Sequence, residues 1–248
     1  MSAPKRVILL GALSTVGESL ARIYARQGAH LVLVARHRQR LEDLAADLRL
    51  RGAGQVHAVA CDLAAEPRAA MLADWVSLLG SVDHIVLLYG VLGEQARAEN
   101  DEAYARELLE TNFLSPAIWS LAAARIFEDR RGGSLVVVGS VAGDRGRQSN
   151  YVYGAAKGGL ATLIQGIAHR LHRVGARAVV IKPGFIATRM TQHLNPRGPL
   201  WASPETVARI IRGAADRGGP IIYAPGFWRL IMLIIRLVPA RLFHKTKL

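Results

Sequence analysis

Cysteine is nearly absent from this chain of 248 residues, in which Cys61 stands alone. A single cysteine cannot form an internal disulfide, which excludes a disulfide-stapled scaffold and agrees with a reducing compartment. The N-terminus lacks a long apolar run, because Val7–Leu10 is too short for the core of a signal peptide. We therefore expect a cytoplasmic protein.

Acidic residues are scarce: 19 Asp and Glu stand against 32 Lys and Arg, which gives a formal net charge of +13. This charge attracts phosphates, nucleic acids or anionic lipids and does not by itself select among them. The basic residues form no recognisable nucleic-acid-binding motif, so we expect no nucleic-acid partner. His169 and His172 are three residues apart, but no second cluster of ligands accompanies them, so we expect no metal site.

The sequence also lacks a linker rich in Pro, Gly or Ser and an internal repeat, which predicts a single domain over residues 1–248. Short apolar runs alternate with helical patterns such as Leu41, Leu44 and Leu48. Uninterrupted apolar strands are typical of a parallel sheet with helices on both faces, whose ligands bind beyond the carboxyl ends of the strands. The runs are Val7–Leu10, Leu31–Ala35, Val56–Ala60, His84–Leu88, Ser134–Gly139, Arg177–Lys182 and Pro220–Tyr223.

A glycine-rich turn, Gly11-Ala-Leu-Ser-Thr-Val-Gly17, follows the first run and leads into a helical pattern. Glycines at these places let a pyrophosphate approach the N-terminus of the helix, where free N–H groups and the helix dipole favour anions. Ser14 and Thr15 are candidates for hydroxyl contacts. The turn matches neither a P-loop nor GxGxxG, so a plain strand-to-helix turn is the alternative.

Arg36 follows the second run, where a dinucleotide-binding fold meets the adenosine ribose. An acidic residue there accepts from a free 2′-hydroxyl, whereas arginine suits a 2′-phosphate, so Arg36 favours NADP(H) over NAD(H). The competing interpretation is a solvated helix start shared with Arg38 and Arg40. Asp62, after the third run, is a candidate acceptor for an adenine amino group or an exposed loop carboxylate.

Tyr153 and Lys157 are four residues apart, which places them on one face of a helix. A nearby ammonium lowers the pKa of a phenol, which then exchanges a proton more readily. Ser140 follows an apolar run and supplies a hydroxyl at the carboxyl edge of the sheet. These three side chains predict a site for acid–base chemistry at a carbonyl group.

The chain resembles the short-chain dehydrogenase/reductase family over nearly its whole length. The turn Gly11-x5-Gly17, with Ser14, Thr15 and Val16 as candidate cofactor contacts, resembles the cofactor turn of the family. The other matching positions are Asp62 for the adenine contact, Gly90 for the end of the NNAG segment, Asn112 for the helix asparagine, Ser140, Tyr153 and Lys157 for the catalytic serine and YxxxK, and Pro183, Gly184, Ile186 and Thr188 for the PG segment beside the nicotinamide.

This resemblance implies a Rossmann-type, doubly wound, seven-stranded parallel sheet and hydride transfer between a nicotinamide and a ketone or secondary alcohol, in a homodimer or homotetramer. It implies that Tyr153 donates the proton, Lys157 lowers the pKa of Tyr153 and holds the ribose, Ser140 positions the carbonyl oxygen, and Asn112 supports a water-linked proton path. The alternative is a dinucleotide-binding sensor or scaffold without catalysis.

Two positions depart from the family pattern. Thr15 replaces a glycine of the cofactor turn, which puts a side chain near the phosphates. Leu87-Leu88-Tyr89 replaces the NNA that precedes Gly90, which removes polar groups that brace the central strand and places an aromatic ring near the nicotinamide or the substrate.

Residues 140–157 and 223–232 resemble the subgroup that contains decaprenylphosphoryl-2-keto-pentose reductases. The likeness implies a keto sugar or another lipid-linked carbonyl compound as substrate. Within it, Arg145 and Arg147 are candidates to meet a substrate phosphate, with a solvated surface loop as the alternative.

The segment 227–238 predicts an apolar helix that carries Arg229 and Arg236 on one stripe. Such a helix is too short to span a bilayer, and Pro239 ends it. It is expected to lie in a membrane interface, with Arg241, Lys245 and Lys247 near anionic head groups on the inner face of the membrane. The alternatives are packing on its own core, over the substrate pocket or on a partner subunit.

Overall fold

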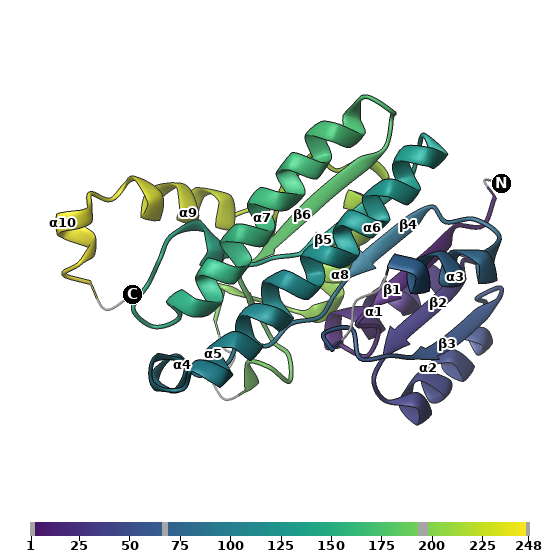
Figure 1. Ribbon diagram of the computed structural model, residues 1–248, viewed down its shortest axis with the longest axis horizontal. Helices are drawn as coiled ribbons and strands as arrows, with labels where there is room; N and C mark the ends of the chain where they lie inside the picture. Colours follow the sequence, from purple (N-terminus) through teal and green to yellow (C-terminus); the bar gives the residue numbers. More distant parts are fainter. Residues whose placement is uncertain (1–2, 66–68, 193–197, 247–248) are drawn as a thin grey trace.

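The computed structural model describes residues 3–65, 69–192 and 198–246. Its centre is a sheet of seven parallel strands in the order β3-β2-β1-β4-β5-β6-β9 (Figure 1). The order reverses direction at β1 and β4, which is the signature of a doubly wound sheet. The strands are β1 Arg6–Leu10, β2 His30–Ala35, β3 Val56–Ala60, β4 His84–Leu87, β5 Ser134–Val138, β6 Arg177–Pro183 and β9 Ile221–Ala224.

Helices cover both faces of the sheet. The helices α1 (Thr15–Ala25), α2 (Arg38–Leu50) and α8 (Pro204–Arg217) pack on the face that receives Val7 and Leu9. The helices α3 (Ala69–Leu79), α6 (Ser115–Arg130) and α7 (Tyr151–His172) pack on the face that receives Ile8 and Leu10. Because strand side chains alternate between faces and both faces are covered, the strands are apolar throughout.

The predicted Rossmann-type fold is confirmed. Each of the seven apolar runs forms a strand of the main sheet, and the bounds differ by at most one residue at either end. Leu41, Leu44 and Leu48 are all buried on one face of α2, as their spacing predicts.

Several short elements lie in the connections that follow the strands. Between β4 and α6 the chain forms α4 (Gln95–Asn100), α5 (Glu102–Leu109) and a π-helical turn, η1 (Glu110–Leu114). A 3₁₀ turn, η2 (Val141–Asp144), follows β5, and a small sheet of β7 (Phe185–Ile186) and β8 (Trp201–Ala202) follows β6.

The C-terminal arm, which we define as residues 227–246, extends away from the two helical layers (Figure 1). It consists of α9 (Trp228–Leu237) and α10 (Ala240–Phe243), so the helix predicted over 227–238 is present. Lys247, which was expected to act with this segment, lies outside the described residues. None of the helices described is both long and apolar enough to cross a membrane.

Candidate functional site

A cavity of about 910 Å³ lies at the carboxyl edge of the main sheet. It is lined by all but two of the site residues predicted from the sequence; the exceptions are Gly17 and Asn112. The predicted residues that line it are Gly11, Ser14, Thr15, Val16, Arg36, Asp62, Gly90, Ser140, Tyr153, Lys157, Pro183, Gly184, Ile186 and Thr188. These residues come from the carboxyl ends of six strands with the connections that follow them, and from α7, and they meet in one concave space.

The glycine-rich turn brings β1 directly into α1. Gly11 has a φ of +87°, and a Cβ on it would lie 2.9 Å from Cβ of Tyr89. Gly17 sits behind the turn, where a Cβ would lie 2.8 Å from the carbonyl oxygens of Gly11 and Ala12. Ser14 caps α1, since its Oγ accepts from the Gly17 amide at 3.1 Å. The Ser14 hydroxyl is thus already engaged as a cap.

One end of the cavity is basic. Arg36 is exposed just beyond β2, and Arg40 from the first turn of α2 lines the same space. Sequence reasoning treated Arg40 only as part of a solvated helix start, and no helical spacing joins it to Arg36, because Arg36 precedes α2. Asp62 is exposed beyond β3 and accepts from the Ala64 amide at 3.0 Å.

Asn112 is fully buried in the π-helical turn and lies behind the cavity wall. Its Oδ1 accepts from the Val91 amide at 3.1 Å, and its Nδ2 donates to the carbonyl oxygens of Val91 and Leu108, both at 2.9 Å. A Cβ on Gly90 would lie 2.7 Å from Asn112 Oδ1 and 3.1 Å from Lys157 Nζ. The side chain of Asn112 therefore fixes the segment that packs against Lys157.

Tyr153 and Lys157 lie in the first turns of α7, opposite Ser140 at the end of β5. Lys157 is buried, and its Nζ donates to the Val138 carbonyl oxygen at 3.3 Å. Burial lowers the pKa of the Lys157 ammonium to about 8. Burial raises the pKa of the Tyr153 phenol to about 12, and a hydrogen bond with Ser140 opposes this rise.

The shift in the pKa of Tyr153 is opposite in direction to the shift expected from the sequence. A lowered phenol pKa was expected from Lys157, but the ammonium nitrogen lies 5.8 Å from the centre of the Tyr153 ring. At that separation the cost of removing the phenolate from water outweighs the attraction of the ammonium. In this structure Tyr153 is therefore a protonated hydroxyl that can donate.

The hydroxyl of Tyr89 braces the end of β4 in place of the polar side chains that are usual in the family at this segment. Its hydroxyl lies 2.7 Å from Ser115 Oγ in α6, and Ser115 in turn donates to the Leu63 carbonyl oxygen. Trp119 Nε1 donates to the same carbonyl at 2.9 Å. The departure at Tyr89 thus still ties the end of β4 to α6, while its ring lines the cavity beside Gly11.

The two arginines after Ser140 have different surroundings. Arg145 does not reach the cavity: its Nη1 donates to the carbonyl oxygens of Ile235, Arg236 and Val238, so the expectation that it meets a substrate phosphate is wrong. Arg147 does line the cavity and is half-buried. Among the described residues its only hydrogen-bond acceptor is Met232 Sδ at 3.4 Å, and its buried Nε has none.

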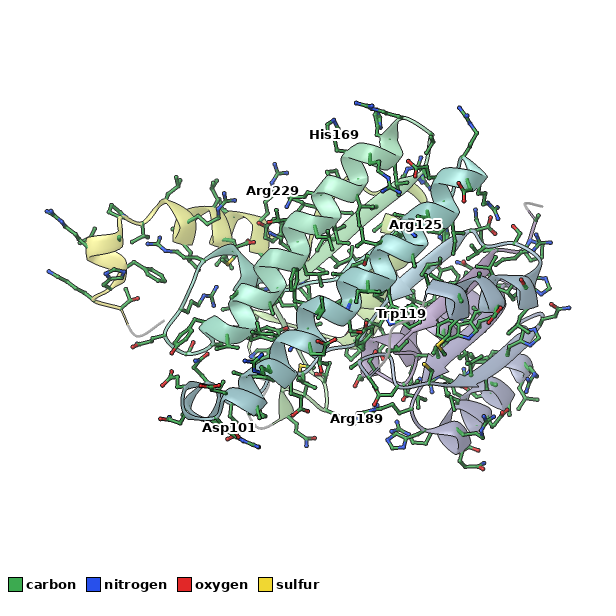
Figure 2. The ribbon with its side chains drawn as sticks, in the orientation of Figure 1. Asp101, Trp119, Arg125, His169, Arg189 and Arg229 are labelled. Carbon is green, nitrogen blue, oxygen red and sulfur yellow. The ribbon has the colours of Figure 1, made fainter. Side chains whose placement is uncertain are left out.

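Two further contacts were missed from the sequence. Asp144 is buried and binds both Lys182 Nζ and the Tyr223 hydroxyl, the latter at 2.7 Å, which ties η2 to the ends of β6 and β9. Arg189, at the lower edge of the body in Figure 2, donates to the Leu13 carbonyl oxygen at 2.6 Å. The position of Arg189 directly after Thr188 could have indicated that it lies near the site. Its acceptor, Leu13, is 176 residues away in the sequence and could not be predicted.

Comparison with known proteins agrees with this geometry. The family model described as short chain dehydrogenase matches residues 5–198. An uncharacterized oxidoreductase of Mycobacterium tuberculosis is 41% identical over 238 residues, which are 94% of this chain and 93% of that protein. A human 3-oxoacyl-acyl-carrier-protein reductase is 31% identical over 207 residues, 80% of this chain and 85% of that protein.

A solved short-chain dehydrogenase from Sphingobium yanoikuyae, in complex with NADPH, superposes with a TM-score of 0.80. It is 24% identical, and the match covers 95% of this chain and 98% of that one, so this likeness supports the fold. The family match covers most of the chain, and the Mycobacterium tuberculosis relative matches nearly end to end. The chain therefore belongs to the short chain dehydrogenase family of oxidoreductase enzymes.

Proposed function

We propose that this protein is an NADP(H)-dependent oxidoreductase that transfers a hydride between the nicotinamide and a ketone or secondary alcohol. The observation that carries the proposal is that one cavity brings Ser140, Tyr153 and Lys157 together with the Gly11 turn and Arg36. A dinucleotide needs such an extended cavity, because its adenosine end, with the 2′-phosphate, and its nicotinamide ring bind far apart.

The described residues fit the proposed cofactor. The Gly11 turn exposes the N-terminus of α1, which suits the pyrophosphate, and Arg36 with Arg40 suits a 2′-phosphate. Thr15, where a glycine is usual, lines the same wall, so its side chain is available to the phosphates. The bound NADPH of the Sphingobium yanoikuyae neighbour supports this choice, with NAD(H) as the alternative. When bound, the cofactor supplies the hydride.

The residues at the reacting end have separate tasks in ketone reduction. Tyr153 is protonated, so its hydroxyl donates a proton to the carbonyl oxygen as that oxygen gains negative charge. The Ser140 hydroxyl holds the same oxygen and hydrogen-bonds Tyr153. The Lys157 ammonium stabilises the phenolate that remains and holds the ribose. Asn112 is a positioning residue that acts through the Gly90 segment, beside a water-linked proton path.

The substrate is proposed to be a keto sugar or a lipid-linked carbonyl compound, as in the keto-pentose reductase-like subgroup. Arg147 supports a substrate that carries an anionic group, because its half-buried charge lacks a carboxylate partner in the described chain. The nearby Asp144 is already engaged by Lys182 and Tyr223. We further propose that the protein is a homodimer or homotetramer, and that it is cytoplasmic or held at the inner face of a membrane.

The test is NADPH oxidation across a panel of ketones and keto sugars that includes lipid-linked ones. On the best substrate, Tyr153→Phe should lower kcat by about 10²–10⁴-fold while NADPH still binds. Lys157→Met should impair both turnover and NADPH binding. Tyr151→Phe is the matched control, because Tyr151 is exposed two residues away and outside the cavity lining. NADPH binding without turnover of any substrate would favour the alternative, a non-catalytic dinucleotide-binding sensor.

A further inference from the structure

The helix α9 has an inner apolar face that packs on the body of the protein. Trp228 and Met232 are buried against Val141, and Ile231 and Ile235 are partly buried beside them. Arg145 holds the C-terminal end of α9, because its guanidinium donates to carbonyl oxygens at that end of the helix. The same guanidinium lies 3.8 Å from the centre of the Phe243 ring in α10. The arm is therefore held in a fixed position relative to η2.

The outer face of α9 is equally apolar, and none of the residues that the structure describes covers it. The side chains of Leu230, Leu233, Ile234 and Leu237 are 63%, 50%, 58% and 72% exposed. Their spacing of three, four and seven residues puts them on one stripe of the helix. Leu242 of α10, 58% exposed, adds to the same arm. Scattered exposed leucines are ordinary, but a continuous stripe of this kind marks an interaction surface.

The charges around this stripe are all positive. Residues 219–248 contain no Asp or Glu. Arg229 and Arg236, seven residues apart, lie between the inner and outer faces of α9, and both are exposed; Figure 2 shows Arg229 on the free side of the helix. Arg241 and Lys245 are also exposed. The arm thus combines an apolar stripe with a basic border.

We propose that this outer face docks in the interface of an anionic lipid bilayer, with α9 parallel to the membrane plane. A helix of ten residues is too short to cross the roughly 30 Å hydrocarbon core, but it suits the boundary between acyl chains and head groups. Pairing with the arm of a second copy is less favourable, because Arg229, Arg236 and Arg241 would meet like charges without an acidic residue in either arm.

Docking would place the bilayer next to the reacting end of the cavity. The inner face of α9 contacts cavity-lining residues, since Met232 Sδ accepts from Arg147 and the Trp228 ring packs against Phe185. A substrate dissolved in the membrane would then lie only the width of one helix away from cavity-lining residues. This consequence rests on the proposed function, whereas the docking itself rests on the arm alone.

The test is co-sedimentation of the full chain with vesicles of phosphatidylcholine, with and without phosphatidylglycerol. We expect binding to the anionic vesicles at low salt and its loss at high salt. The variant Leu230→Gln/Ile234→Gln/Leu237→Gln leaves the inner face intact and should lower the partition coefficient by about tenfold or more. The matched control is Leu50→Gln/Leu78→Gln/Leu121→Gln, which changes three exposed leucines on other helices and should bind as the parent does.

A second pair of variants tests the charges. Arg229→Gln/Arg241→Gln/Lys245→Gln should weaken binding to anionic vesicles only, whereas Arg106→Gln/Arg125→Gln/Arg173→Gln, which removes three charges at exposed positions elsewhere, should have a smaller effect. A parent chain that stays in the supernatant overturns the proposal. If the leucine variant instead reduces the size of an oligomer in sedimentation velocity, the occupant is a second copy. NADPH oxidation with a water-soluble ketone, measured without vesicles, tests the proposed function separately.

Discussion

The indole of Trp228 fills the space that any side chain on Gly184 would occupy. A Cβ on Gly184 would overlap the Trp228 ring atoms, and the edge of the Trp228 ring also packs on Phe185 with 5.4 Å between ring centres. Gly184 and Phe185 line the cavity, while Trp228 belongs to the C-terminal arm. The shape of the reacting end therefore depends on a helix that follows the sheet.

Replacing Gly184 with alanine should displace Trp228. We expect Gly184→Ala to lower the free energy of unfolding by about 1–3 kcal/mol, the usual cost of overpacking a core. Urea denaturation measures this change. Gly226→Ala is the control, because a Cβ there meets no atom within 4 Å. Replacing the indole by a smaller side chain, in Gly184→Ala/Trp228→Leu, should recover part of the lost free energy of unfolding. If it does not, the effect of Gly184→Ala does not come from overlap with Trp228.

The buried ammonium of Lys157 predicts a pH limit for reduction. Its pKa of about 8 means that it is charged below that pH and neutral above it. If the charge stabilises the Tyr153 phenolate, kcat/KM for NADPH-dependent reduction should be level below pH 8 and fall above it. The Tyr153 pKa of about 12 adds no limit in this range. Lys157→Arg keeps a positive charge at this position above pH 8, so whatever activity remains should show no such fall. A parent profile that stays level to pH 10 would contradict a role for the Lys157 charge in reduction.

Arg36 predicts the choice between the two nicotinamide cofactors. NADPH should bind more tightly than NADH by about 1–3 kcal/mol, the scale of a charge-assisted hydrogen bond. Arg36→Asp should reverse the order, because a carboxylate repels a 2′-phosphate and accepts from a free 2′-hydroxyl. Titration calorimetry measures both affinities. Arg38→Asp serves as control, since Arg38 is exposed outside the cavity lining. Equal affinities in the parent protein would refute the role of Arg36.

Arg147 predicts a preference for anionic substrates. Arg147→Met removes a half-buried cation that contacts only Met232 among the described acceptors, so KM for a phosphorylated ketone should rise while KM for a neutral ketone changes little. Steady-state kinetics with a matched pair of ketones provides the comparison. Gln148→Met, at the exposed neighbouring position, should leave both values unchanged. Equal increases for the two ketones would point to a structural role instead.

The sheet could be predicted because its strands are buried on both faces, so each appears as an apolar run such as Val56–Ala60. The cavity followed from the rule that carboxyl ends of parallel strands meet, which brings Gly11 and Ser140 to one edge. Contacts between loops that are distant in the sequence produce no such pattern, so they could not be predicted. Arg145 and the carbonyl oxygen of Ile235 are 90 residues apart, and either could equally have faced water.

The same limit applies to the electrostatics. The spacing of Tyr153 and Lys157 predicts that they share a helix face, but it does not give the depth at which both are buried. That depth decides the sign of the pKa change at Tyr153, because desolvation and the ammonium act in opposite directions. Similarly, no sequence pattern singles out Asp144, whose side chain is buried against Lys182.

The buried His84 predicts a loss of stability in mild acid. Its Nδ1 lies 2.8 Å from the Tyr24 hydroxyl, and its Nε2 lies 3.3 Å from Asp216 Oδ1, so a neutral ring protonated on Nε2 satisfies both. Burial lowers the pKa of His84 to about 4, against about 6.5 in an unfolded chain, although Asp216 acts in the opposite direction. Between these values the unfolded state binds a proton that the folded state does not, so stability falls as the pH drops.

The expected loss from His84 is at most about 3 kcal/mol between pH 6.5 and 4. Urea denaturation at a series of pH values should show the parent losing stability faster than His84→Gln, so the difference between the two narrows as the pH falls. His169→Gln, on an exposed turn of α7, should follow the parent curve (Figure 2). A constant difference between the parent and His84→Gln would mean that carboxylates such as Asp216, whose pKa Arg212 holds low, account for the whole acid effect.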